Sequence, residues 1–324
     1  MKVVVTGAGG FIGSHLVQRL VTEGFNVRAF THYNSRSDWG QLEFLPTNIL
    51  QEIEVVAGDI QDPFTVRKAI AHTELVFHLS SLIAIPYSYI APQSYISTNI
   101  TGALNVMQAS LTENVAKVVH TSTSECYGTA RYVPIDENHP MQGQSPYSAS
   151  KIGADMVAES FFRSFNLPVA IIRPFNTYGP RQSARAIIPT IISQALTGTA
   201  IRLGALEPTR DLNFIDDTVS AFLKIALTPG TEGEVINVGS GKEISVGELT
   251  RLILELMEID RPIETDSQRI RPSKSEVTRL LCDNTKAKKL LGWEPTVSLR
   301  NGLSQTIDWF RSNSGRYKSK TYNI

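Results

Sequence analysis

Seven residues near the start of the chain, Gly7-Ala-Gly-Gly10-Phe-Ile-Gly13, limit the possible folds more than any other stretch. They follow a short β-branched run, residues 2–6, which is typical of a strand buried on both faces. Apolar residues at helical spacing come next, and Gly24 ends this predicted helix. A strand, a glycine-rich turn and a helix in this order predict the first unit of a parallel α/β sheet.

Each glycine of this turn has a separate role in a site for a dinucleotide. Gly7 permits the tight turn, Gly10 lets the backbone approach a pyrophosphate, and Gly13 lets the helix pack closely on the strand. The start of the helix, at Phe11 and Ile12, offers free N–H groups and a positive dipole end to the phosphates. Glycine spacing alone is a weak signal, but between a strand and a helix it predicts binding of NAD or NADP.

Strands and helices alternate along the first half of the chain. The expected strands are residues 26–30, 53–57, 75–79, 115–120 and 169–173, and the expected helices are residues 63–72, 98–111 and 146–165. This alternation predicts an α/β fold with a doubly wound parallel sheet and right-handed crossovers.

The pattern changes after about residue 175, where Pro and Gly become frequent. Helices are expected at residues 187–196, 219–226, 246–257 and 303–310. We therefore predict a dinucleotide-binding domain at residues 1–175 and a smaller, mixed α/β substrate domain at residues 176–324. Residues 235–238 are expected to form a strand that rejoins the main sheet.

The composition argues against several classes of partner. The 324 residues include 31 Lys or Arg and 31 Asp or Glu, so the formal net charge is zero, whereas a nucleic-acid binder usually shows a basic excess. Two cysteines provide neither a disulfide framework nor metal-ligand spacing. No segment reaches the ~18 apolar residues of a membrane span. We expect a soluble, cytoplasmic protein that binds no nucleic acid, membrane or metal.

The ribose of the cofactor would be recognised after the second strand, where an acidic side chain usually binds the 2′-hydroxyl group. Thr31 stands at that place, and the nearest acid, Asp38, lies in the loop beyond it. Arg36 could meet a 2′-phosphate, so these residues favour NADP slightly, although Arg36 could equally be a solvated loop charge. Asp59, followed by Ile60 at the end of the third strand, could bind the adenine amino group or cap the next helix.

A second motif, Tyr147-Ser-Ala-Ser-Lys151, carries acid–base chemistry. Ser145 has the position of a helix N-cap and Pro146 that of the first helical residue, so Tyr147 and Lys151 share one helix face. A Lys beside a Tyr hydroxyl favours the phenolate and lowers the pKa of the Tyr. Tyr147 could then remove an alcohol proton while hydride leaves the same carbon.

Together these motifs resemble the extended short-chain dehydrogenase/reductases, in the NAD-dependent epimerase/dehydratase group that acts on nucleotide sugars. The resemblance covers nearly the whole chain and includes RPFNTYGPRQ (173–182), RDLNFIDD (210–217), NVGSG (237–241) and LGWEPTVSLRNGL (291–303). It implies a Rossmann fold and a homodimer formed through the helices at 98–111 and 146–165.

The resemblance also implies which side chains hold the diphosphate of the substrate. Arg is suited to bidentate contact with phosphate, and the positions that match the group's motifs are Asn176, Arg181, Arg210 and Arg271. Glu276, in the same stretch as Arg271, is a weaker candidate.

The stretch TSTSECYG (121–128) separates the reactions of this group. In such enzymes a Ser or Thr near the Tyr hydrogen-bonds the reacting sugar oxygen, and Thr123 matches that position. Hexose 4-epimerases typically carry no acid after it, whereas 4,6-dehydratases carry Thr-Asp-Glu (dTDP-glucose type) or Thr-Ser-Glu (GDP-mannose type). Thr123-Ser124-Glu125 therefore implies a 4,6-dehydratase: C4 is oxidised, Glu125 exchanges the C5 proton, water leaves from C6, and hydride returns to C6.

The substrate implied most closely is UDP- or GDP-N-acetylglucosamine, because SSLIAIPYSYIAP (80–92) resembles a loop of dehydratases that act on such nucleotides in nonulosonate pathways. The proton donor to the leaving water stays open, since the Ser124 hydroxyl is a poor acid: either Glu125 is both base and acid, or Ser124 orders a water. Two other functions stay open, a UDP-hexose 4-epimerase and a non-catalytic NAD(P)-binding regulatory protein. The latter would not need Glu125, Tyr147 and Lys151 together.

Overall fold

The computed structural model describes residues 1–316 and contains a seven-stranded parallel sheet, in the order β10-β6-β5-β4-β1-β2-β3. Its strands are β1 (Lys2–Thr6), β2 (Asn26–His32), β3 (Ile53–Gly58), β4 (Leu75–His78), β5 (Lys117–Thr121), β6 (Val169–Pro174) and β10 (Val235–Val238). The doubly wound parallel sheet predicted from the alternation is confirmed. The strand order reverses between β1 and β4, and such sheets bind ligands beyond the carboxyl ends of the strands at this reversal.

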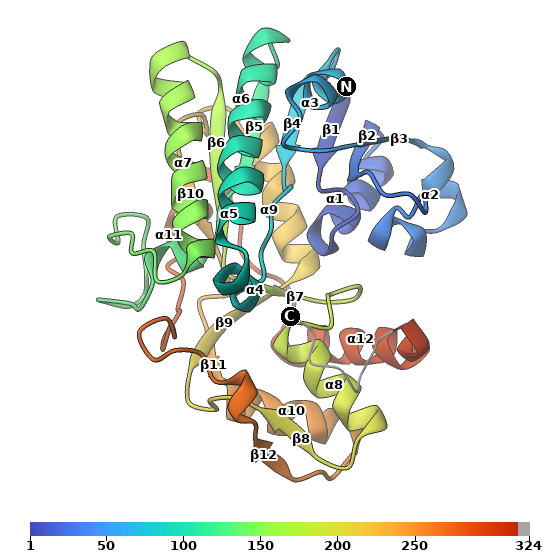
Figure 1. The fold of residues 1–324 in the computed structure, drawn as a ribbon, viewed down its shortest axis with the longest axis vertical. Helices are drawn as coiled ribbons and strands as arrows, with labels where there is room; N and C mark the ends of the chain where they lie inside the picture. The colour runs from blue at the N-terminus through green and yellow to red at the C-terminus, as the bar shows by residue number, and fades with distance from the viewer. Residues whose placement is uncertain (317–324) are drawn as a thin grey trace.

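Helices cover both faces of this sheet (Figure 1). One face carries α1 (Phe11–Thr22) and α9 (Ile215–Leu227), and the other carries α3 (Pro63–Ile70), α6 (Gly102–Thr112) and α7 (Pro146–Phe165). Val3 and Val5 of β1 pack in the core with α1 and α9, whereas Val4 packs in the core with α6 and α7. Because both faces are covered, the strand is apolar at every one of these positions.

The remaining elements form a smaller unit, in the lower half of Figure 1. Its small sheets are β7 (Asn176–Tyr178), β9 (Thr209–Phe214) and β11 (Glu243–Ser245) in one, and β8 (Ile201–Leu203) with β12 (Ile263–Thr265) in the other. Its longer helices are α8 (Ile187–Thr197), α10 (Val246–Met257) and α12 (Leu299–Ser312). The chain returns to the large sheet with α9, which packs against β5 and β6, and with β10, which pairs with β6.

Shorter helices complete the fold: α2 (Thr47–Gln51), α4 (Ile85–Ile90), α5 (Pro92–Tyr95), α11 (Thr285–Leu291), the π-helix η2 (Ile96–Thr101), and the 3₁₀ turns η1 (Gly40–Phe44), η3 (Ser124–Tyr127), η4 (Ser267–Arg269) and η5 (Ser314–Arg316). Two of these segments, η2 and α4, differ from the secondary structure predicted from the sequence. The helix predicted from residue 98 begins as the π-helix η2, and the stretch 80–92, predicted as a loop, contains α4. Three-residue strands such as β7 were not predicted, because they are too short to show a periodic pattern.

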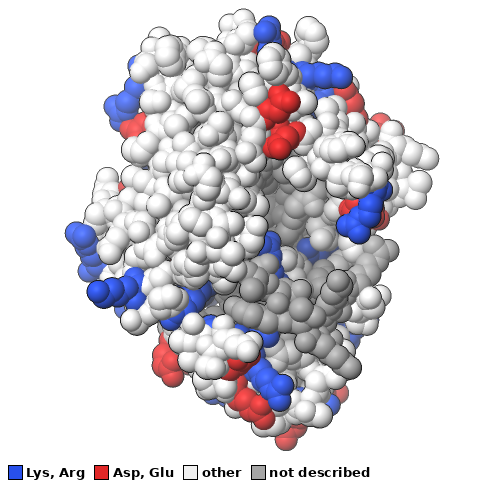
Figure 2. Space-filling model, viewed as in Figure 1, with Lys and Arg blue, Asp and Glu red and all other residues white. Residues whose placement is uncertain are grey.

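Figure 2 shows acidic and basic side chains interspersed over one face rather than gathered by sign. This distribution agrees with the formal net charge of zero. Among residues 1–316, no helix combines the length and apolar character needed to cross a membrane.

Candidate active site

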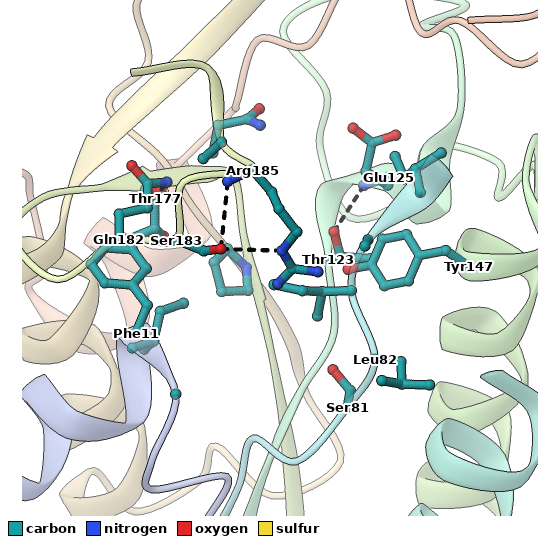
Figure 3. Close-up of a pocket in the computed structure, with 18 of the residues that line it drawn as sticks. Phe11, Ser81, Leu82, Thr123, Glu125, Tyr147, Thr177, Gln182, Ser183 and Arg185 are labelled. Atoms are coloured by element: carbon teal, nitrogen blue, oxygen red, sulfur yellow. Dashed lines mark hydrogen bonds between the residues drawn. The ribbon is translucent and has the colours of Figure 1, made fainter. Parts of the chain in front are cut away.

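A cavity of about 950 Å³ opens where the strand order of the large sheet reverses, and residues of the smaller unit form its other side. The glycine-rich turn, the stretch 121–125 and the start of α7 all contribute to its lining. Figure 3 shows Thr123, Glu125 and Tyr147 on one wall, opposite Gln182 and Arg185. The cavity therefore joins the two motifs that the sequence analysis predicted to carry the chemistry.

The glycine-rich turn has the shape that a dinucleotide requires. Gly7 has a φ of +70°, and a Cβ on Gly13 would lie 2.2 Å from the carbonyl oxygen of Gly7. Gly10 is the N-cap of α1 and no side chain caps this helix, so its first N–H groups remain available to a phosphate. Phe11 and Ile12 line the cavity together with the three glycines. These residues fit the pyrophosphate of NAD or NADP.

The structure decides between the two interpretations of Asp59. The N-cap of α3 is Asp62, whose side chain accepts hydrogen bonds from the backbone N–H groups of Phe64 and Thr65. Asp59 instead lines the cavity beside Ile60 and accepts a hydrogen bond from the backbone N–H of Gln61, at 2.9 Å. Asp59 is therefore placed to face a ligand, and the helix-cap interpretation is wrong.

Arg36 is not where a 2′-phosphate contact would require it. It is exposed and does not belong to the cavity lining, whereas Thr31 and Asp38 do. Thr31 and Arg36 favoured NADP only if Arg36 could meet the 2′-phosphate, and the structure gives no support to this contact because Arg36 does not line the cavity.

Tyr147 and Lys151 lie in the first turns of α7, as predicted. The helix begins with a capping box in which the Ser145 hydroxyl accepts from the Ser148 N–H and the Ser148 hydroxyl accepts from the Ser145 N–H. Both Tyr147 and Lys151 are buried and line the cavity. Lys151 Nζ donates to the carbonyl oxygen of Thr121 at 2.6 Å, which fixes the ammonium group at the end of β5.

One electrostatic expectation is wrong for this structure. Lys151 was expected to lower the pKa of Tyr147. Instead burial raises the pKa of Tyr147 above its ordinary value, and a hydrogen bond with Thr123 opposes this shift only in part. Burial also lowers the pKa of Lys151.

The stretch 121–128 sends its side chains in two directions. Thr123, Ser124 and Glu125 line the cavity, and the Thr123 hydroxyl accepts from the Glu125 N–H at 3.2 Å to begin the 3₁₀ turn η3. Cys126 and Tyr127 are fully buried and do not belong to the cavity lining. Burial raises the pKa of the Cys126 thiol to about 12, which argues against a catalytic thiolate at this position.

A buried ion pair beneath this stretch was not predicted. Arg173 of β6 lies 2.7 Å from Asp155 of α7, and both side chains are almost completely buried. The Ser122 hydroxyl donates to Asp155 at 2.5 Å, and Arg173 donates to the Tyr127 hydroxyl at 2.9 Å. Burial alone would raise the pKa of Asp155, but His120, whose Nε2 lies 3.3 Å from Asp155 Oδ1, and the charge of Arg173 hold it below the ordinary range. The one available signal was the position of Asp155, one helical turn after Lys151.

Three of the four residues expected to bind the diphosphate line the cavity: Asn176, Arg210 and Arg271. Nitrogen atoms of Arg210 and Arg271 lie 3.1 and 3.6 Å from the same carboxylate oxygen of Glu276. This shared carboxylate holds the two cations near each other, so Glu276 belongs to the same cluster.

Arg181 is the exception, because it does not belong to the cavity lining. Its Nη2 donates to Gln18 Oε1 at 2.9 Å, and its Nε lies 3.1 Å from His15 Nε2. Both partners belong to α1, so the side chain packs against this helix. The structure thus contradicts a direct contact of Arg181 with substrate.

Arg185 is a cavity residue that the sequence analysis missed. Its side chain extends from the loop before α8 toward Thr123 and Tyr147, and its Nε donates to the Ser183 hydroxyl at 3.1 Å (Figure 3). No motif identified it, because its direction depends on how the loop crosses the cavity.

Comparison with known proteins agrees with this geometry. The model of the GDP-mannose 4,6-dehydratase family matches residues 4–306. The chain belongs to this family.

The relatives of this family member include enzymes of two reaction types. The UDP-glucose 4-epimerase of Mycolicibacterium smegmatis is 35% identical, over 97% of this chain and 100% of the relative. The dTDP-glucose 4,6-dehydratase of Streptomyces antibioticus is 31% identical, over 97% of this chain and 93% of the relative. The crystal structure of the dTDP-glucose 4,6-dehydratase of Streptomyces venezuelae, with NAD bound, superposes with a TM-score of 0.88 at 28% identity, covering 99% of this chain and 100% of that one.

These comparisons confirm the predicted fold, the extended short-chain dehydrogenase/reductase family and the use of NAD or NADP. The protein is therefore an enzyme of the class that contains nucleotide-sugar 4,6-dehydratases and epimerases. Because the relatives include both reactions, the choice between them rests on the residues of the site.

Proposed function

We propose that the chain is a nucleotide-sugar 4,6-dehydratase that acts on UDP- or GDP-N-acetylglucosamine. The observation that carries this proposal is the position of Glu125, which lines the cavity on the same wall as Thr123 and Tyr147 (Figure 3). A 4-epimerase moves hydride at C4 only and needs no further acid, whereas a dehydratase must also exchange a proton at C5.

The protein's side chains would divide the proton transfers as follows. The nicotinamide dinucleotide, when bound, accepts a hydride and later returns it. Tyr147 takes the proton of the C4 hydroxyl as C4 becomes a ketone, and it must be a phenolate to do so. Lys151, one helical turn further along the same helix face, would stabilise this phenolate against the effect of burial. The ketone acidifies the C5 proton, which Glu125 removes. The protons released from the C4 oxygen and from C5 balance the two consumed, one by the leaving C6 hydroxyl and one by C5 when hydride adds to C6.

The proton donor to the leaving hydroxyl would come from the same turn. Ser124 lines the cavity and is only 2% exposed, but its hydroxyl is a poor acid. We therefore assign this transfer to Glu125, directly or through a water that Ser124 orders.

Recognition of the nucleotide would fall to the cluster on the other side of the cavity. Arg210 and Arg271 can offer forked N–H donors to a diphosphate, and Asn176 lines the same cavity. Arg185 extends toward the catalytic wall, so we assign it a contact with the sugar or the phosphate next to it.

The test is the mass of the product. Purified protein incubated with NAD and either UDP- or GDP-N-acetylglucosamine should yield a nucleotide sugar lighter by one water. Glu125→Gln should abolish this product. Oxidation of the sugar at C4 should still occur in this variant and should still reduce the cofactor. Glu52→Gln, at an exposed position outside the cavity lining, is the matched control and should behave as wild type. Full dehydration by Glu125→Gln would contradict the assigned role.

A second candidate is a UDP-hexose 4-epimerase, which the 35% identical relative favours. It would leave the mass unchanged and invert C4, which proton NMR of the product resolves. Inversion without loss of water would overturn the dehydratase proposal.

We also infer a homodimer through α6 and α7. These neighbouring helices expose Leu104 and Met156, at 44% and 43%, and η2 exposes Ile96 at 41%. Large apolar side chains gathered on adjacent helices are typical of an interface. Sedimentation velocity should show a dimer, and Leu104→Glu should shift it to the monomer. A wild-type monomer at all concentrations would contradict this inference.

A further inference from the structure

The loop after β2 is folded tightly against the glycine-rich turn. The Gln41 N–H donates to the carbonyl oxygen of Gly9 at 2.9 Å. A Cβ on Gly40, whose φ is +66°, would lie 2.5 Å from the same oxygen, and a Cβ on Gly9 would lie 2.7 Å from the carbonyl oxygen of Trp39. Side chains of this loop therefore stand at a fixed place beside the cofactor's phosphate site.

Hydrogen bonds inside the loop set the direction of Asp38. The Asn34 side chain accepts from the backbone N–H groups of Arg36 and Asp38, each at 3.1 Å, and donates to the Asp38 carbonyl at 2.7 Å. Asp38 Oδ1 in turn accepts from the Gly40 N–H at 2.7 Å. This bond uses only Oδ1, so Oδ2 is left to accept a hydrogen bond from a ligand.

The end of the cavity near β2 and β3 is the side for the adenosine half of the cofactor. The phosphates belong at the start of α1, and the catalytic residues Tyr147 and Lys151 lie beyond β5, on the other side of the strand reversal. In such sheets the adenosine ribose lies beside the end of the second strand. Thr31 and Asp38 line that part of the cavity, and Arg36 does not.

The charge of this part of the wall is unfavourable for a 2′-phosphate. Its described lining residues are Thr31, His32, Asn34, Asp38, Trp39, Gly40, Gly58 and Asp59, and none of these is Lys or Arg. A carboxylate accepts a hydrogen bond from a ribose hydroxyl but repels the dianionic phosphate that NADP carries at the same position.

We propose that Asp38 replaces the acid missing at Thr31, binds the ribose 2′-hydroxyl group, and makes this enzyme select NAD over NADP. This assignment reverses the slight preference for NADP drawn from Thr31 and Arg36. It rests on the use of a nicotinamide dinucleotide and does not depend on which sugar reaction the enzyme carries out.

Binding of NAD and of NADP to the full chain, measured separately by titration calorimetry without sugar nucleotide, tests the proposal. Trp39 lines the same wall, so quenching of tryptophan fluorescence gives a second readout. Wild type should bind NAD at least 10-fold more tightly than NADP. Asp38→Asn keeps an acceptor for the Gly40 N–H but loses the charge. It should lower the ratio of the two affinities by about 10- to 100-fold, the range for hydrogen bonds to charged groups.

Two further variants make the outcome unambiguous. Asp260→Asn, an exposed aspartate outside the cavity lining, is the matched control and should keep the wild-type ratio. Arg36→Ala should not weaken NADP binding. Wild type that binds NADP as tightly as NAD, an unchanged ratio in Asp38→Asn, or selective loss of NADP binding in Arg36→Ala would each overturn the proposal. Because no reaction is followed, these results stand apart from the dehydratase assay.

Discussion

Replacing Asp155 by Asn removes one negative charge from the buried cluster beneath residues 121–125 and keeps the shape of the side chain. Asp155 is 1% exposed and Arg173 is 3% exposed, with 2.7 Å between their charged atoms. Removing one partner of a buried ion pair costs about 3–5 kcal/mol of unfolding free energy, because the other charge is left buried and unpaired. The amide oxygen can still accept a hydrogen bond, so we expect a loss of about 3 kcal/mol, at the lower end of that range.

The same variant should lower kcat, because the cluster holds the stretch that carries Thr123 and Glu125. Ser122 donates to Asp155, and Arg173 donates to Tyr127. Asp155 is not part of the cavity lining, so it acts as a positioning residue. A displacement of about 1 Å can cost roughly 10²-fold in rate. We expect kcat to fall 10- to 100-fold, about that range, with KM nearly unchanged.

Urea denaturation of wild type and Asp155→Asn measures the stability change, and Glu159→Gln is the matched control. Glu159 lies on the same helix and pairs with Arg163 on the surface, where such a pair contributes only about 0.3–0.5 kcal/mol. The pKa of Asp155 is lowered in the folded state, so its contribution is complete above the ordinary Asp pKa of about 4. This contribution to the free energy of unfolding is lost as the pH falls through the pKa that Asp155 has in the folded state. The difference between wild type and Asp155→Asn should therefore narrow below about pH 4. A loss smaller than about 1 kcal/mol at neutral pH would refute the role of this ion pair.

Three further variants test other parts of the site. Gly13→Ala should weaken NAD binding, because its Cβ would lie 2.2 Å from the Gly7 carbonyl oxygen; wild-type affinity by calorimetry would contradict the close packing. Tyr147→Phe should lower kcat by about 10²–10⁴-fold, the usual contribution of a positioned acid or base, while NAD affinity stays unchanged; a normal kcat would mean that another group is the base. Arg185→Ala should raise the KM for the nucleotide sugar by about 10-fold, as loss of a charge-assisted hydrogen bond does, whereas Arg202→Ala, an exposed control, should not; an equal KM in both would remove Arg185 from the substrate site.

The local part of this protein follows from the sequence by itself. The glycine turn after β1, the start of α7 at Pro146 and its end at Phe165 were predicted and are found in the structure. The alternation of strands and helices that gives the parallel sheet was also predicted and is also found. These features depend on residues close together in the chain, such as the glycines that permit the turn and the Ser145 hydroxyl that caps α7. They need little information from elsewhere.

The direction of individual side chains was decided only by the tertiary structure. Arg181 and Arg185 are four residues apart, yet the first packs on α1 and the second extends into the cavity. Arg36 and Asp38 are two residues apart, and only Asp38 lines the cavity. In each pair the outcome depends on how a loop packs against segments distant in the chain, which no local pattern records.

The electrostatics of the site were also beyond the sequence. The spacing of Tyr147 and Lys151 placed them on one helix face, but it could not show that burial raises the pKa of the Tyr and lowers that of the Lys. The ion pair beneath Thr123 and Glu125 joins α7 to β6, and it forms only when the helix packs on the sheet. The sequence therefore determined which candidate catalytic groups are present. The packing of the helices on the sheet determined the shifts of their pKa values and the directions of their side chains, because burial and long-range contacts exist only in the folded chain.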